Sequence, residues 1–386
     1  MTGPLAGARI VEMAGLGPGP FAGMLLADLG ADVVRVDRVG PAATRGDARA
    51  YVMHRGRRSV AVDLKHPDGL EVVLRLVEDT DALIEGYRPG VMERLGLGPD
   101  VCRTRNPRLV YGRMTGWGQD GPLAPTAGHD IDYIGLSGAL SACARHGERP
   151  LPPVNMVGDF GGGGAFLALG IVAAMWEAQR SGVGQVIDAA MVDGSAVLTT
   201  MMHGLLAQGR WRDEAGVNFA DTGSPFYDVY ECADGRFVGV GAIEGPFYGE
   251  LLEGLGLSRD ELPDRRDEAN WPALKERFTS FFRTRTRDEW AEHFARTDAC
   301  VAPVLSLTEA PSHPHNTARG TFVVHGGIVQ PAPAPRFSRT PSALGHTPPA
   351  PGDDSPEILG ELGYGTDDIA RLLATGAVLT SERHDR

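Results

Sequence analysis

The chain has 386 residues, 42% of them hydrophobic and 23% charged, which is typical of an ordinary globular protein of about two domains. Its formal net charge of −13 disfavours DNA or RNA as a partner. The four cysteines form no CxxC pair, so we expect neither a disulfide framework nor a metal site. The longest apolar stretch, residues 165–176, is too short to cross a bilayer, and the N-terminus does not read as a secretory signal. These features predict a cytoplasmic protein that contacts no membrane.

The first half of the chain alternates strands and helices. A strand at residues 8–13 leads through a turn rich in glycine and proline into a helix at 21–29, and a Val-rich strand follows at 31–37. The alternation continues to a strand near 184–191, which follows an apolar helix at 165–180. This pattern predicts an α/β domain with a parallel, doubly wound sheet.

The pattern changes near residue 220. The segment SPFYDVYECADGRFVGVGAIE alternates like a hairpin around Asp234 and Gly235, and charged helical stretches follow it. A proline-dense segment from residue 331 reads as an extended surface linker, and a terminal helix is expected at 354–373. We therefore predict a large domain at 1–189, a linker helix at 190–219, a small domain at 220–319, and a return segment with the C-terminal helix at 320–386, which packs on the large domain.

Positive charge is concentrated in residues 35–58, which hold seven arginines and two aspartates within an acidic protein. Two interpretations stay open at this stage. The arginines form a solvated surface, or they line a pocket for a small polyanion. Because lysine is nearly absent from the chain, a general preference for arginine contributes to this signal.

The turn at residues 15–22, GLGPGPFA, is close to a dinucleotide-binding fingerprint, and Asp37 ends the next strand about twenty residues later. A glycine turn at the start of a helix can approach phosphate groups. Two prolines within this turn, however, remove N–H groups that such a loop would direct at a pyrophosphate. The sequence therefore favours a tight turn between strand and helix over an NAD site.

Three later segments carry residues suited to acid/base chemistry. His129 is flanked by Asp130 and Asp132, which would favour the charged imidazole. Asp159 precedes four glycines at 161–164, which either allow close packing or direct backbone N–H groups toward a developing negative charge. Glu244 follows a strand of the small domain. Together these segments offer an acid, a base and an anion site on three loops.

The motifs resemble the class III CoA-transferase (CaiB/BaiF) superfamily and, within it, the α-methylacyl-CoA racemases. The resemblance runs from GPLAGARIVEM through YGRMTGWGQDGP, AGHDIDYI and NMVGDFGGGG to YECADGRFVGVGAIE and the C-terminal helix, and so covers nearly the whole chain. It implies a Rossmann-like large domain, a smaller α+β domain and a homodimer of interlocked chains. It also implies an acyl-CoA substrate and no separate cofactor, because coenzyme A is part of that substrate.

The resemblance further implies that the enzyme racemises 2-methylacyl-CoA thioesters through an enolate. His129, assisted by Glu244, and Asp159 would be the two acid/base groups, and backbone N–H groups at Asp159 and the following helix start would stabilise the enolate oxygen. Contacts to coenzyme A would come from Arg38, Val62, Asp63, Leu64, Lys65, Gly86, Tyr87, Arg88, Arg94, Gly128, Asp130, Ile131, Asp132, Tyr133 and Asn155.

Two alternatives remain open. A class III CoA-transferase would use Asp159 as a nucleophile and would need neither His129 nor Glu244. Transferases of this type often have a glycine-rich loop where this chain has AIE, which favours the racemase. A CoA-ester carrier or sensor could use the same pocket without chemistry. The acyl group itself is left open by the sequence.

Overall fold

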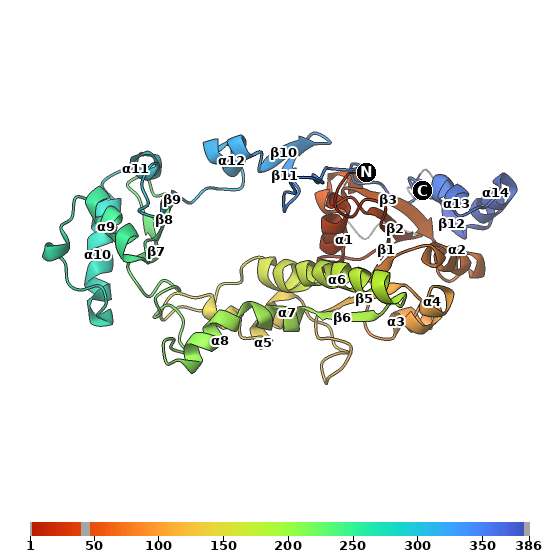
Figure 1. Ribbon diagram of the computed structural model, residues 1–386, viewed down its shortest axis with the longest axis horizontal. Helices are drawn as coiled ribbons and strands as arrows, with labels where there is room; N and C mark the ends of the chain where they lie inside the picture. The colour runs from red at the N-terminus through yellow and green to blue at the C-terminus, as the bar shows by residue number, and fades with distance from the viewer. Residues whose placement is uncertain (1, 40–46, 382–386) are drawn as a thin grey trace. The chain divides into compact units, whose positions relative to one another are not determined.

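The computed structural model describes residues 2–39 and 47–381, and these divide into two compact units (Figure 1). The first unit comprises residues up to 137, 154–198 and those from 318 onward, and the second comprises 138–153 and 199–317. This division differs from the expected boundaries at 138–153, which we assigned to the large domain. In the second unit, Arg145 of this segment forms a 3.1 Å ion pair with Asp228.

The first unit is built on a seven-stranded sheet with the order β12-β3-β2-β1-β4-β5-β6. All neighbouring pairs are parallel except β12 with β3, which is antiparallel. The parallel order 3-2-1-4-5-6 is that of the Rossmann fold, whose ligands bind at the carboxyl ends of the strands where the order reverses, here between β1 and β4. The predicted fold class is confirmed. The strands are β1 (Arg9–Met13), β2 (Asp32–Arg38), β3 (Arg57–Val62), β4 (Ala82–Glu85), β5 (Val110–Thr115), β6 (Val186–Ala190) and β12 (Val378–Leu379).

Helices cover both faces of this sheet, so its strands alternate between two apolar cores. On one face α1 (Pro18–Asp28) and α6 (Phe166–Ser181) bury Leu26 and Ile171 against Ile84. The other core contains Leu83 and Tyr111 and is covered by α2 (Pro67–Glu78), α4 (Pro99–Arg105), α13 (Ser355–Glu361) and α14 (Thr366–Thr375). The prediction of a single terminal helix at 354–373 is wrong. It is split into α13 and α14, with Gly363 between them at a φ of 81°.

The glycine run at 161–164 is helical, which corrects the loop expected there. A π-helical segment, Met156–Ala165, leads directly into α6. Its glycines allow three helices to approach closely. A Cβ atom on Gly162 would lie 2.6 Å from the backbone nitrogen of Ser195 in α7 (Met191–Leu198), and one on Gly164 would lie 2.6 Å from the carbonyl oxygen of Pro18 in α1. The run therefore serves packing.

The joined helix, Met156–Ser181, is longer than the apolar stretch read from the sequence. By length and composition alone, its 26 residues could cross a membrane. One side of it packs on the sheet, where the side chains of Leu167 and Ile171 would contact any Cβ atom added to Gly112 of β5. Leu169 and Trp176 on this helix are 65% and 64% exposed. Their exposure leaves an apolar surface on the first unit.

The second unit contains an antiparallel sheet of β7 (Tyr227–Glu231), β8 (Phe237–Gly241) and β9 (Val301–Pro303). The predicted hairpin is confirmed, and Gly235 takes a φ of 73° in its turn. The helices α9 (Gly245–Gly254), α10 (Trp271–Phe282) and α11 (Arg287–Phe294) belong to this unit, and their aromatic side chains form its core. The linker helix expected at 190–219 is shorter and is broken at Thr199 into α7 and α8 (Thr200–Ala207).

Residues 318–381 return to the first unit. The hairpin of β10 (Phe322–His325) and β11 (Ile328–Pro331) is held by Arg55, which donates hydrogen bonds of 2.9 Å to the Gln330 side chain and to the Pro331 carbonyl. The proline-dense segment then binds the edge of the sheet. The carbonyl of His346 accepts from the Gly56 N–H at 2.7 Å, and the Asp354 carboxylate accepts from the Ser59 N–H at 2.7 Å.

The packing of the glycine run leads to a stability prediction. Gly162→Ala is expected to destabilise the protein by about 1–3 kcal/mol, because the added methyl group has no space against α7. Gly360→Ala is the matched control, since this helical glycine of α13 has no neighbour within 4 Å of an added Cβ. It should leave stability unchanged or raise it slightly. Denaturant titration of both variants measures this, and equal effects would contradict the packing role.

Candidate active site

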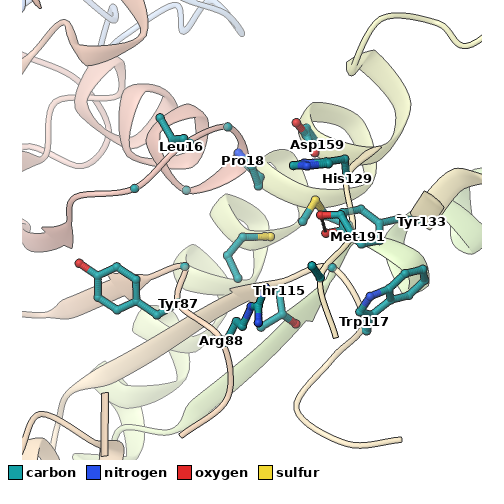
Figure 2. Close-up of a pocket in the computed structure, with 18 of the residues that line it drawn as sticks. Leu16, Pro18, Tyr87, Arg88, Thr115, Trp117, His129, Tyr133, Asp159 and Met191 are labelled. Atoms are coloured by element: carbon teal, nitrogen blue, oxygen red, sulfur yellow. Dashed lines mark hydrogen bonds between the residues drawn. The ribbon is translucent and has the colours of Figure 1, made fainter. Parts of the chain in front are cut away.

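A pocket of about 470 Å³ opens at the carboxyl ends of β1, β4 and β5 in the first unit (Figure 2). Its place matches the point where the strand order reverses. Four segments converge on it: the turn before α1, the loop after β4, the loop after β5 with the start of α5 (Asp130–Leu136), and the first turn of the 156–181 helix. Its lining includes Leu16, Gly17, Gly86, Tyr87, Arg88, Met114, Trp117, Gly128, His129, Tyr133, Asp159 and Met191.

The turn that resembles a dinucleotide fingerprint forms one wall of this pocket. Gly17 caps α1 at a φ of 68°, and Pro18 occupies the first position of the helix. A Cβ atom on Gly17 would lie 3.2 Å from Oδ2 of Asp159. The turn therefore passes close to a carboxylate of the protein.

Most arginines of the 35–58 stretch are used inside the fold. Arg57 is fully buried, forms a 2.9 Å ion pair with Glu12, and donates to the carbonyl of Pro20 in the turn. Arg55 pairs with Asp28 at 2.6 Å, and both side chains are buried. Ion pairs of this stretch also join Arg35 to Asp37, Arg49 to Asp353, and Arg58 to Asp32.

Neither interpretation of the charge cluster is therefore correct for most of the stretch, because its arginines neutralise carboxylates of the fold. Among the described arginines of the stretch, Arg38 alone has no ion pair, and it stands exposed at the end of β2. Arg45 lies outside the described residues. The cations available to a ligand at the pocket are thus fewer than the sequence indicates.

Asp159 lies in the first turn of the 156–181 helix, where its carboxylate reaches the pocket. Burial raises the pKa of this carboxyl group, and the nearby Asp130 adds to the increase. Asn155 acts in the other direction. Its Nδ2 donates to Oδ2 of Asp159 at 2.6 Å, and this bond and the nearby His129 lower the same pKa. The net shift is upward, as expected for a carboxyl group in a partly dry site.

His129 lies beside Asp159 at the start of α5 (Figure 2). Its backbone N–H donates to the Asp132 carboxylate at 2.9 Å, so this acidic neighbour caps the helix. Within the described part of the chain, no ion pair joins the imidazole to either flanking aspartate. The imidazole is exposed to the pocket. It is free to contact a bound molecule.

The backbone N–H of Asp159 is not available to an enolate, which corrects the role expected for it. This group donates to Oδ1 of Asp130 at 2.7 Å. At the start of α5, by contrast, the N–H of Asp130 has no acceptor among the described residues. N–H groups in the first turn of a helix point out of its N-terminal end and attract negative charge.

Comparison with known proteins now assigns the chain to a family. The sequence profile of CoA-transferase family III matches residues 5–355. The chain belongs to this family. It is 46% identical to the α-methylacyl-CoA racemase of Mus musculus and 45% identical to that of Homo sapiens, in each case over 95% of this chain and 96% of the relative. It is also 31% identical to the succinyl-CoA–D-citramalate CoA-transferase of Chloroflexus aurantiacus, over 96% of this chain and 97% of that protein.

A solved structure supports the same assignment. The CaiB/BaiF family protein from Brucella suis superposes with a TM-score of 0.81 at 25% identity, covering 94% of this chain and all of that chain. The family resemblance predicted from the sequence motifs is confirmed.

The residues expected to contact coenzyme A fall into two groups. Gly86, Tyr87, Arg88, Gly128 and Tyr133 line the pocket. The remaining residues do not. Val62 is buried in β3, Leu64 packs on the core, and Asp63 accepts the N–H of Lys65. Arg38 stands at the end of β2, Arg94 ends α3 (Val91–Arg94), and Ile131 is exposed on α5. The side chains of Asp130, Asp132 and Asn155 form hydrogen bonds within the protein.

Glu244 belongs to the second unit, where it precedes α9 and its carbonyl accepts the N–H of Tyr248 at 2.9 Å. Its predicted pairing with His129 stays a prediction.

Several lining residues were not predicted as site residues. Trp117 follows β5 and packs edge to face on Tyr133, with ring centres 4.8 Å apart. Leu16, Met114 and Met191 give the pocket apolar walls. In the sequence, only their positions directly after or beside strand ends indicate that these residues line a pocket. This indication is weak, because apolar residues at such positions usually belong to the core.

The raised pKa of Asp159 leads to a prediction about stability. The folded protein holds this proton more tightly than the unfolded chain, so the ionised carboxylate destabilises the fold at pH values above its folded-state pKa. The destabilisation disappears once the pH falls below the ordinary carboxyl range, where both states are protonated. Asp159→Asn is therefore expected to raise the Tm at neutral pH, and the increase should vanish in acid.

Thermal unfolding across the pH range checks this. Asp264→Asn is the control of opposite sign, because the hydrogen bond from Arg266 lowers the pKa of Asp264 to about 2. Loss of the ionised Asp264 carboxylate in this variant should lower the Tm at neutral pH. An Asp159→Asn variant with a reduced Tm at neutral pH would argue against a strained catalytic carboxylate.

Proposed function

We propose that this protein is an α-methylacyl-CoA racemase, an isomerase that inverts the carbon next to the thioester of 2-methylacyl-CoA substrates. The observation that carries the proposal is the presence of two acid/base groups, His129 and Asp159, on a single pocket. The 46% identity to the mouse racemase supports it. No cofactor is needed for this reaction, because the thioester itself makes the α-hydrogen acidic.

Inversion requires one group to remove a proton from one face of the α-carbon and a second group to deliver a proton to the other face. An imidazole can do either near neutral pH. A carboxyl group does so only if its pKa is raised toward the working pH, and burial acts on Asp159 in that direction. His129 and Asp159 are therefore suited to exchange the roles of acid and base between the two directions of the reaction. Glu244 is proposed to assist His129.

The enolate oxygen needs a hydrogen-bond donor, because removal of the α-proton moves negative charge onto it. We assign this role to the N–H of Asp130 at the start of α5: Asp130 is not itself a lining residue, but it directly follows the lining residue His129, and its N–H has no acceptor among the described residues. Such a donor typically contributes about 3 kcal/mol to transition-state stabilisation. Arg88, on the pocket wall, and Arg38, at the end of β2, are the cations proposed to meet the phosphates of coenzyme A.

The reaction mechanism predicts the stereochemistry of two variants. His129→Ala and Asp159→Asn should each lose inversion by about 10²- to 10⁴-fold, as is typical when a general acid or base is removed. Each variant keeps one working base. It should therefore still exchange the α-hydrogen of one epimer for deuterium without inversion, and the two variants should prefer opposite epimers. Incubation of each 2-methylacyl-CoA epimer in D2O, followed by mass spectrometry and chiral analysis, measures both rates.

The CoA-transferase alternative predicts a different result for the same variants. In that mechanism Asp159 is a nucleophile, so its loss abolishes CoA transfer while His129→Ala stays nearly fully active. Racemisation by His129→Ala at the rate of the unsubstituted enzyme would therefore refute the two-base reaction and favour the transferase.

We also propose that the active protein is a homodimer. Leu169 and Trp176 of α6, with Leu198 of α7, are exposed apolar side chains on the first unit. Burial of such a surface is a common reason for association. Sedimentation velocity at about micromolar concentration should give a dimer. A folded and active monomer under these conditions would contradict the proposal.

A further inference from the structure

We infer that Asp130 is a positioning residue that fixes the separation of the two acid/base groups, His129 and Asp159. The inference rests on the proposed racemase reaction, because only an inversion needs two groups held on opposite faces of one carbon. Small errors in such a geometry are costly to rate, since a displacement of about 1 Å can reduce catalysis by about 10²-fold.

Asp130 is connected to both groups. It directly follows His129 in the chain and begins α5, so its backbone moves with the imidazole. Its Oδ1 accepts the backbone N–H of Asp159 at 2.7 Å, so its side chain also holds the segment that carries the second group. Asp130 is only 6% exposed, which shields this hydrogen bond from water. One residue thus joins the two segments that must be held apart by a fixed distance.

The neighbouring sequence is suited to this contact. Gly158 precedes Asp159, and a Cβ atom on it would overlap Oδ1 of Asp130 and lie 3.0 Å from Cγ2 of Ile134. A side chain at position 158 would therefore push α5 away from the 156–181 helix. The Asp159 N–H also belongs to the first helical turn, which has no acceptor within its own helix and favours a carboxylate.

The same contact affects the proton on Asp159. Burial is the main cause of the raised pKa of Asp159, and the charge of Asp130 raises it further. The other polar groups that face Asp159 are His129, Asn155, Tyr51 and Tyr133. None of these four side chains is a carboxylate, so Asp130 is the one carboxylate of this set that acts on Asp159. It therefore holds the backbone of Asp159 and adds to the rise in the pKa of the Asp159 carboxyl group that burial begins.

Two variants separate the hydrogen bond from the charge. Asp130→Ala removes both, whereas Asp130→Asn keeps a carbonyl oxygen for the Asp159 N–H and removes only the charge. Asp354→Ala is the matched control, because the Asp354 carboxylate likewise accepts a backbone N–H from a distant segment, that of Ser59 at 2.7 Å, and does not line the pocket. Inversion and α-deuterium uptake are measured for each epimer in D2O, over a range of pH.

Asp130→Ala is expected to lose inversion by about 10²-fold while it keeps deuterium uptake from at least one epimer, so the ratio of inversion to exchange falls. Asp130→Asn should invert within about tenfold of the unsubstituted enzyme, and the acidic limb of its pH–rate profile should move to lower pH. Asp354→Ala should keep the normal ratio. A residue with only a structural role would reduce inversion and exchange together and leave their ratio unchanged, and that result in Asp130→Ala would overturn the inference.

Amide hydrogen exchange of the peptide that contains Asp159 provides a test that does not depend on activity. Exchange at this amide should accelerate in Asp130→Ala but not in Asp130→Asn. Equal protection in Asp130→Ala and the unsubstituted protein would overturn the inference by showing that the hydrogen bond does not hold this segment. If the unsubstituted protein inverts no 2-methylacyl-CoA, the proposed function fails and the positioning role fails with it. If it does invert, an unchanged ratio in Asp130→Ala refutes the positioning role alone.

Discussion

The geometry of the pocket depends on the close approach of three helices at the glycine run. Gly162 allows α7 to pass within contact of the 156–181 helix, and Gly164 does the same for the first turn of α1. This packing places Asp159 against Gly17 on one wall of the pocket. Because backbone meets backbone at these points, the distances are set by van der Waals contact and leave little room for side-chain adjustment. The Asp159 carboxylate can therefore have a defined position, although the first turn of a helix has few internal hydrogen bonds to hold it.

Below the pocket, charge is used to fix the backbone. The fully buried pair of Arg57 and Glu12 lies under the turn that begins α1, and the guanidinium also binds the carbonyl of Pro20. Gly23 has no side chain, and a Cβ atom there would meet both partners of this pair. Removing one partner of a buried pair leaves an uncompensated charge, which is strongly destabilising. The turn is consequently held by the interior of the domain as well as by its neighbours.

The sequence was sufficient to predict the architecture but only part of the site. Alternating strands and helices at residues 8–37 predicted the parallel sheet, because local periodicity determines which faces are buried. His129 and Asp159 were both found, and they do share the pocket. The partners of the arginines could not be predicted, because Arg55 meets Asp28 only once the sheet has formed. The glycine run was wrongly placed in a loop, whereas the close packing given as one of its two roles is what the contact of Gly162 with α7 shows.

The antiparallel strand β12 has a consequence for how the protein is made. It pairs Val378 with Val62 and so covers the edge of β3 with residues from the far end of the chain. A ribosome therefore releases the whole second unit before it supplies the strand that closes the sheet. During that interval β3 presents unpaired backbone groups, which is the kind of edge that recruits other chains. The nascent protein is thus most vulnerable to misassociation late in synthesis, when most of its domain structure already exists.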